Sequence, residues 1–168
     1  MKKLIGIFTM FMIAGFLIAW SSGVMDKAQK KPKVEQKIML IPGNKDMTPT
    51  GFTVHEKDQV TIKASGYIYF SNGNAQSKTA PDGWARSNYA ADWPEDANAC
   101  DDPLMEENHA ALIADVDGEK FPIGKEATFV GKAGLLYLGI NDCTFTGDFY
   151  NTGQFSVVIA IERGGGSQ

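Results

Sequence analysis

Residues 155–161 carry the pattern that most restricts the fold, because large apolar side chains recur there at every second position. Phe155, Val157, Ile159 and Ile161 fall on one side of an extended chain. A β-strand points successive side chains to opposite faces, whereas an amphipathic helix needs a period near 3.6 residues. The segment therefore predicts a strand with one face in a hydrophobic core.

Other short segments share this strand-like composition and are separated by Gly, Pro, Asn and Asp, which mark turns. After residue 23 no stretch shows a long helical period. Many short strands joined by turns are typical of an all-β protein built as a β-sandwich. The further strands that we expect are residues 59–64, 67–70 (after a break at Ser65-Gly66), 110–116, 127–130 and 134–140.

One long segment, Ser71 to Asn108, does not fit the strand pattern and is rich in Asn, Asp, Ala and Pro. A loop of this length inside a compact domain is usually functional or disordered. Three large aromatic residues, Trp84, Tyr89 and Trp93, argue against disorder. We predict a long ordered loop that covers one end of the sandwich.

The first 23 residues have the order of a secretory signal peptide. Lys2 and Lys3 precede an uncharged apolar run over residues 4–20, and small residues allow cleavage after Gly23. An uncleaved membrane anchor is the alternative. We predict an exported protein, which is periplasmic, cell-surface or secreted. Its expected parts are a signal peptide or anchor (1–23), a linker (24–33), one domain (34–162) and a flexible tail (163–168).

Charge and cysteine content narrow the partners and the compartment. Without Lys2 and Lys3, 14 of the 16 basic residues remain against 20 acidic ones, a net charge of −6. Such a domain repels phosphate backbones, so nucleic acid is not an expected partner. Cys100 and Cys143 are the two cysteines, and in an oxidising compartment they predict one disulfide; two separate buried thiols are the alternative.

The densest polar cluster lies between the two clearest strands, over residues 141–153. It holds two Asp and two Asn together with several turn residues. Calcium takes six to eight oxygen ligands from carboxylates, amides and backbone carbonyls, and this segment offers all three. Zinc is disfavoured because the segment has no His. The alternative is an Asx-rich turn whose side chains cap their own backbone.

Several pieces of the sequence, in order, resemble the PA-IL-like family of bacterial galactose-binding lectins. The resemblance implies a calcium-dependent β-sandwich of the galactose-binding-domain-like, jelly-roll type. The ending is the most specific part: a strand, an Asn-Asp pair, a loop, an Asn-x-Gly and a final strand. The matching pieces are residues 47–54, 57–66, 81–83, 111–113, 121–124, 136–142 and 151–157.

The resemblance also implies which residues would bind calcium and sugar. Two of the expected calcium ligands are backbone carbonyls, and Tyr150 is an alternative to Asp148. The expected ligands are Phe70 (carbonyl), Asp142, Thr146 (carbonyl), Asp148 and Asn151. Asp142 and Asn151 are expected to contact the sugar as well.

The family's sugar-selecting His-Pro-x-Gln piece is matched here by residues 93–96, with Trp93 for His and Asp96 for Gln. Trp93 and Asp96 are therefore the other expected sugar contacts, although Trp93 has an equal claim as a packing anchor. The departure leaves open whether the sugar is a galactose-type glycan. Single-site affinity is expected to be modest, so useful binding would need several sites, as in a homo-oligomer.

An enzyme is not expected. His55 and His109 are the only histidines, and both are expected at a surface or a strand end. No nucleophile elbow or zinc-protease motif occurs. A glycosidase carboxylate pair drawn from Glu95, Asp96, Asp101 and Asp102 is permitted but not indicated. The other alternative is a calcium-stabilised structural or interaction module of the cell envelope that binds no free sugar.

Overall fold

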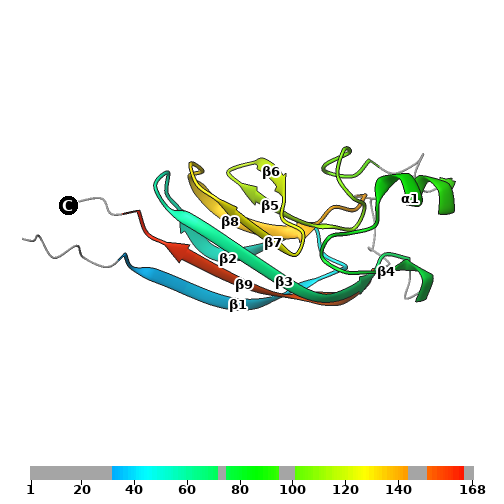
Figure 1. The fold of residues 1–168 in the computed structure, drawn as a ribbon, viewed down its shortest axis with the longest axis horizontal. Coiled ribbons are helices and arrows are strands. Elements are labelled where there is room, and N and C mark those ends of the chain that lie inside the picture. Colours follow the sequence, from blue (N-terminus) through cyan, green and yellow to red (C-terminus); the bar gives the residue numbers. More distant parts are fainter. Residues whose placement is uncertain (1–31, 72–74, 95–100, 144–150, 165–168) are drawn as a thin grey trace, which may run out of the picture. The chain divides into compact units, whose positions relative to one another are not determined.

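The structure is a computed structural model that describes residues 32–71, 75–94, 101–143 and 151–164. These residues form nine strands, one short α-helix and one 3-10 turn (Figure 1). The strands are β1 (Val34–Pro42), β2 (Met47–Val54), β3 (Gln59–Tyr69), β4 (Lys78–Thr79), β5 (Leu112–Val116), β6 (Glu119–Pro122), β7 (Glu126–Phe129), β8 (Gly134–Ile140) and β9 (Thr152–Glu162); the 3-10 turn is η1 (Ala75–Ser77) and the helix is α1 (Arg86–Asp92).

The strands form two antiparallel sheets, which confirms the predicted all-β sandwich. Sheet A has the order β1-β9-β3-β4, and β7 also pairs with β3. Sheet B has the order β2-β8-β5-β6. One cluster of buried apolar residues joins the inner faces of the two sheets.

The alternation in residues 155–161 is the main contribution of sheet A to this core. Phe155, Val157, Ile159 and Ile161 are each fully buried, as their spacing predicted. Leu112 and Leu138 face them from sheet B and are also fully buried. Burial of a side chain of this size contributes about 1.5–3 kcal/mol, so this layer dominates the stability of the domain.

The predicted break at Ser65-Gly66 is wrong. Residues 59–69 are one strand, β3, which pairs with β9 along its whole length. Gly66 has a φ of +98°, and a Cβ there would lie 2.9 Å from the carbonyl oxygen of Gln154. Glycine thus allows a left-handed φ and a close approach of the neighbouring backbone inside a continuous ladder, so this glycine marks a close contact between two strands and not a turn.

Four strands were not predicted from alternation: β1, β2, β4 and β6. The reason is clearest at β1, which is an edge strand of sheet A. Val34, Ile38 and Leu40 on its outer side are more than half exposed, whereas Ile41 is fully buried. Apolar residues on both faces remove the period of two that identifies a half-buried strand.

The long segment 71–108 is structured where it is described. It contains η1, β4 and α1, and α1 lies at one end of the sandwich (Figure 1). Trp84 exchanges backbone hydrogen bonds with His109, at 2.7 and 3.0 Å, which ties the segment to the chain just before β5. Tyr89 in α1 is buried.

Among the described residues no helix is long and apolar enough to cross a membrane.

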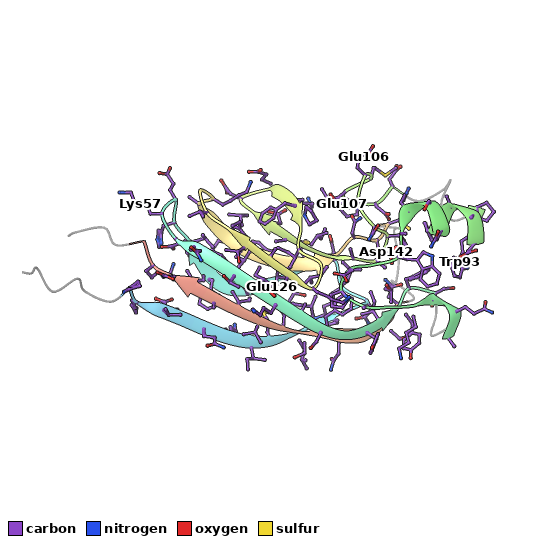
Figure 2. All side chains as sticks on the ribbon, viewed as in Figure 1. Lys57, Trp93, Glu106, Glu107, Glu126 and Asp142 are labelled. Carbon is purple, nitrogen blue, oxygen red and sulfur yellow. The ribbon has the colours of Figure 1, made fainter. Side chains whose placement is uncertain are left out.

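The connection between β8 and β9 passes from sheet B to sheet A at this same end. Ile140 ends β8 beside Leu112, and Thr152 begins β9 beside Tyr69. The pairing of Tyr69 with Thr152 therefore brings the backbone of Phe70 close to Asn151, the residue before β9. Figure 2 shows Asp142 and Trp93 at this end, with Lys57 at the opposite one.

Candidate functional site

Asp142 and Asn151 lie at the two ends of the connection between β8 and β9, and their side chains meet. Nδ2 of Asn151 donates to Oδ2 of Asp142 at 2.5 Å and to the carbonyl oxygen of Gly43 at 3.0 Å. Asp142 is 6% exposed and Asn151 is 5% exposed. The two residues on which the metal prediction most depends are therefore buried together.

Asn141 has a different task from its neighbour. Its backbone pairs with Ala110 and Ala111, both at 2.7 Å. Its side chain accepts from the backbone N–H of Leu104 at 2.8 Å and donates to the carbonyls of Leu104 and Asn108, each at 3.0 Å. Asn141 is fully buried and braces the segment before β5 against the end of β8, so the Asn of the Asn-Asp pair is structural.

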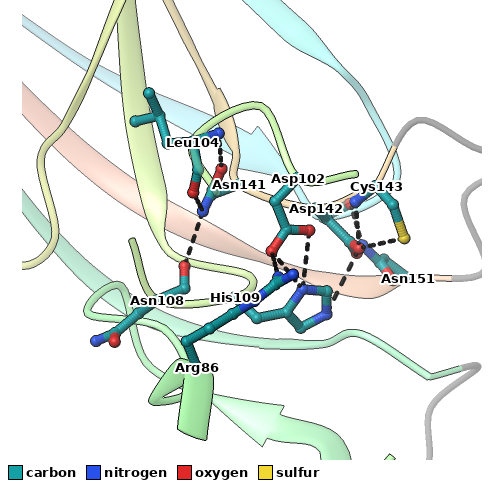
Figure 3. Close-up of polar contacts among 10 residues, drawn as sticks. Arg86, Asp102, Leu104, Asn108, His109, Asn141, Asp142, Cys143 and Asn151 are labelled. Carbon is teal, nitrogen blue, oxygen red and sulfur yellow. Dashed lines mark hydrogen bonds and ion pairs between the residues drawn. The ribbon is translucent and has the colours of Figure 1, made fainter. Parts of the chain in front are cut away.

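His109 links Asp142 to a second buried carboxylate, that of Asp102 (Figure 3). Its Nδ1 lies 3.1 and 3.2 Å from the two carboxylate oxygens of Asp102, and its Nε2 lies 3.5 Å from Oδ1 of Asp142. His109 is 1% exposed. It lies at a strand end beside the start of β5, which was one of the two expected positions, and it is buried rather than at the surface. His55, by contrast, has a side chain that is 69% exposed.

Asp102 is neutralised from its other side by Arg86, the first residue of α1. The guanidinium group of Arg86 donates to Oδ2 of Asp102, whose side chain is fully buried. Arg86, Asp102, His109 and Asp142 thus form one continuous line of charged or ionisable groups. The line runs from the long segment to the end of β8.

Burial governs the electrostatics of Asp142. Removal from water raises the pKa of this carboxyl, and the nearby charge of Asp102 raises it further. His109 and the hydrogen bond from Asn151 act in the opposite direction without cancelling the effect of burial. A cation placed beside Asp142 would offset this cost. The ligand atoms of Asp102, His109 and Asp142 lie within 4.8 Å of one another, and this cluster could hold a metal ion.

Aromatic rings enclose His109. The ring of Tyr89 stacks on it at 3.7 Å with an interplanar angle of 7°, and the ring of Phe70 meets it edge-on at 4.8 Å. Phe70 also contacts Trp84 and Trp93, at 5.8 and 5.3 Å between ring centroids. The two predicted residues Phe70 and Trp93 therefore belong to the surroundings of the polar cluster.

A pocket of about 520 Å³ opens beside these rings and is lined by Gln76, Trp84, Asp92 and Trp93. Trp84 and Trp93 meet there edge-to-face at 5.6 Å. The indole Nε1 of Trp84 is buried and has no hydrogen-bond partner among the residues that the structure describes. Aromatic faces with a carboxylate and an amide beside them are a suitable lining for a polar, ring-shaped ligand.

The predicted site is thus only partly visible in the described residues. Asp142 and Asn151 come together, and Phe70 and Trp93 lie nearby; whether the Phe70 carbonyl binds a metal stays a prediction. Asp102 and His109 were not predicted, because their partners are distant in sequence and neither residue forms part of a motif. The remaining predicted residues lie outside the described residues: Asp96, Thr146, Asp148, its alternative Tyr150, and Cys100, so that the Cys100–Cys143 disulfide stays a prediction.

Two antiparallel sheets and a buried Asp-His-Asp cluster at the sheet-to-sheet connection define an all-β sandwich that could hold a metal ion. No protein-family model matches the sequence, and no curated protein sequence matches it. Among solved structures, the chain is similar to one described as "EclA N-terminal domain; PllA-like lectin". The TM-score is 0.55 and the identity is 24%, over 74% of this chain and 95% of that one. The likeness shows a lectin-like fold.

Proposed function

We propose that this protein is an exported, calcium-dependent, lectin-like protein that binds carbohydrate and has no enzymatic role. The observation that carries the proposal is the meeting of Asp142 and Asn151, two buried oxygen-bearing side chains at the ends of one loop. The lectin-like fold of the similar structure supports it. The proposal also includes export, the Cys100–Cys143 disulfide, and the ligands Phe70, Thr146 and Asp148.

The donor chemistry of the described residues fits calcium. Asp142 supplies a carboxylate whose burial is not compensated by its protein neighbours. Asn151 uses Nδ2 for Gly43 and Asp142, and within the described residues its Oδ1 has no hydrogen-bond partner. Calcium accepts both kinds of oxygen. His109 is a less usual neighbour for calcium, and its Nδ1 is occupied by Asp102.

Calcium in such a site supplies coordination positions that two neighbouring hydroxyls of a sugar can fill. Asp142 and Asn151 would then orient those hydroxyls. Each hydrogen bond to the sugar would contribute a net free energy of about 0.5–1.5 kcal/mol to binding. Trp93 offers an aromatic ring, and the pocket that it shares with Trp84 and Asp92 gives a sugar ring room beside the polar cluster. Asp96 is the further proposed contact.

One observation favours the alternative of a calcium-stabilised envelope module without free-sugar binding. Asp142, Asn151 and His109 are all at most 6% exposed. A cation there could serve to neutralise Asp142 and to fix the β8–β9 connection without meeting a ligand from solvent. The two functions differ in whether glycan binding accompanies calcium binding.

Glycan-array binding and thermal melting, each with calcium and with a chelator, test the proposal. Calcium at 100 times its Kd should stabilise the wild-type protein by about 2.7 kcal/mol. Asp142→Ala should abolish both this stabilisation and glycan binding, whereas Glu106→Ala removes an exposed acid of the neighbouring segment and should change neither. Calcium stabilisation without any glycan signal would favour the envelope module. No calcium effect on the wild type would reject both.

A further inference from the structure

The side chain of His109 is held in place by contacts on several sides. Tyr89 stacks on one face of the imidazole, Phe70 meets its ring edge-on, and Asp102 binds Nδ1. These contacts fix both the plane of the ring and the direction of Nε2, which faces Oδ1 of Asp142 at 3.5 Å.

We propose that His109, backed by Asp102 and Arg86, is a positioning residue that holds the carboxylate of Asp142 in the orientation that binds the cation. This inference rests on the proposed function, because it concerns how the same site is built. It assigns a role to three residues that supply no expected calcium ligand.

Asp142 has few other restraints on its carboxylate. The backbone N–H of Cys143 donates to Oδ1 at 2.7 Å and Nδ2 of Asn151 donates to Oδ2. Both of these groups belong to the β8–β9 connection itself: Cys143 follows Asp142 directly, and Asn151 is a proposed ligand. Within the described part of the chain, His109 is the side chain that reaches the Asp142 carboxylate from outside this connection, and therefore it orients Asp142 relative to the body of the sandwich (Figure 3).

Arg86 explains how the buried carboxylate of Asp102 can hold His109 in place. Asp102 is fully buried in its side chain and would be costly without a counter-charge. Arg86, whose side chain is 25% exposed, supplies that charge from the first turn of α1. Outer-shell carboxylate–histidine pairs of this kind orient the groups that hold a metal, and their loss typically costs about 10–100-fold in metal affinity.

A matched pair of substitutions separates positioning from packing. The side-chain nitrogen of Gln can occupy the place of Nε2, and that of Asn the place of Nδ1. His109→Gln therefore places an amide nitrogen toward Asp142, whereas His109→Asn places one only toward Asp102. Both lose the aromatic ring that stacks on Tyr89.

The measurements are calcium affinity by titration calorimetry and the Tm in chelator. We expect both variants to lose Tm in chelator by similar amounts. Calcium affinity should stay within about threefold of wild type for His109→Gln and fall about tenfold or more for His109→Asn. Arg86→Gln, at a partly exposed position, avoids a buried substitution and should weaken calcium binding by about tenfold.

Equal calcium affinity in the wild type and all three variants would overturn the positioning role while leaving the calcium site intact. Equal weakening in His109→Gln and His109→Asn would assign the effect to lost packing and would overturn it too. A wild-type protein that binds no calcium in the same titration rejects the proposed function itself, and the positioning role with it.

Discussion

The amide nitrogen of Asn151 lies 2.5 Å from Oδ2 of Asp142, nine residues away across the β8–β9 connection. The amide orientation follows from Gly43, whose carbonyl can only accept and so requires the nitrogen on that side. Asn151 therefore donates one hydrogen bond to the carboxylate of Asp142. The same contact makes the two ends of the connection a single polar unit, and it gives the first prediction.

Asn151→Asp should destabilise the protein in chelator and increase its stabilisation by calcium. The substitution places a second carboxylate beside Asp142 and removes the donor to Gly43, which leaves a buried acceptor unpaired at a cost of about 1–3 kcal/mol. A divalent cation would screen the two carboxylates. Melting with and without calcium measures the difference, and a calcium shift no larger than that of the wild type would contradict the prediction.

Asn141→Ala should destabilise the protein more than any change of an exposed Asn nearby. The side chain of Asn141 is fully buried and makes three hydrogen bonds to Leu104 and Asn108. Its removal takes these three bonds away and leaves the backbone N–H of Leu104 without its acceptor, while the two carbonyls keep the backbone donors of Glu107 and Ala111 at 3.1 and 3.4 Å. We expect a loss of about 2–4 kcal/mol in the free energy of unfolding. Asn108→Ala is the control, because the side chain of this exposed residue makes one hydrogen bond, to Asp82. Urea unfolding of both variants checks the contrast.

The sequence predicts β8 and β9 well, because in both strands the large apolar residues at every second position are the buried ones. Residues 134–140 are the predicted strand without change, and 155–161 is the centre of β9. The same local method fails at Gly66 and at β1. Gly66 looks like a turn until its partner strand is known, and β1 is apolar on a face that no sheet covers.

The candidate site divides along the same line. Asp142 and Asn151 belong to one short loop, so their proximity could be predicted from the sequence. Asp102 and His109 reach Asp142 from 40 and 33 residues away in the numbering, through the exchange of backbone hydrogen bonds between Trp84 and His109 and the brace at Asn141. No local pattern in the sequence predicts these contacts, because they depend on hydrogen bonds between segments that are distant in the chain.

Gly66→Ala should be far more costly than an alanine at another left-handed glycine. At Gly66 the φ of +98° strains any L side chain, and the added Cβ would lie 2.9 Å from the carbonyl oxygen of Gln154. At Gly118, with a φ of +85°, nothing lies within 4 Å of the added Cβ. Strain alone costs about 1–2 kcal/mol, and a clash against a sheet backbone adds about 1–3 kcal/mol. Similar unfolding free energies for the two variants would refute this.

Acid should destabilise the protein at the end of the sandwich opposite the candidate site. Arg163 donates to Oδ2 of Asp58 at 2.6 Å and to Oε2 of Glu35 at 2.7 Å, and so joins the end of β9 to β1 and to the turn before β3. Burial tends to raise the pKa of Asp58, but hydrogen bonds from Arg163 and from the backbone of His55 and Gly164 outweigh it and lower the pKa from 3.8 to about 2. Hydrogen bonds from Arg163 and Lys33 lower the pKa of Glu35 from 4.5 to about 2.

A carboxyl whose pKa is lower in the folded state stabilises the protein above its unfolded value and loses that contribution as the pH falls through the folded value. The free energy of unfolding should therefore decrease between about pH 4.5 and pH 2, and Asp58 should account for about 2 kcal/mol of the loss. Asp58→Asn should lower stability at pH 7 and flatten this decrease. Glu126→Gln, in an exposed pair with Lys63, should leave the profile close to that of the wild type. Urea unfolding across this pH range measures the slope, and an unchanged slope in Asp58→Asn would show that Arg163 does not stabilise the ionised form.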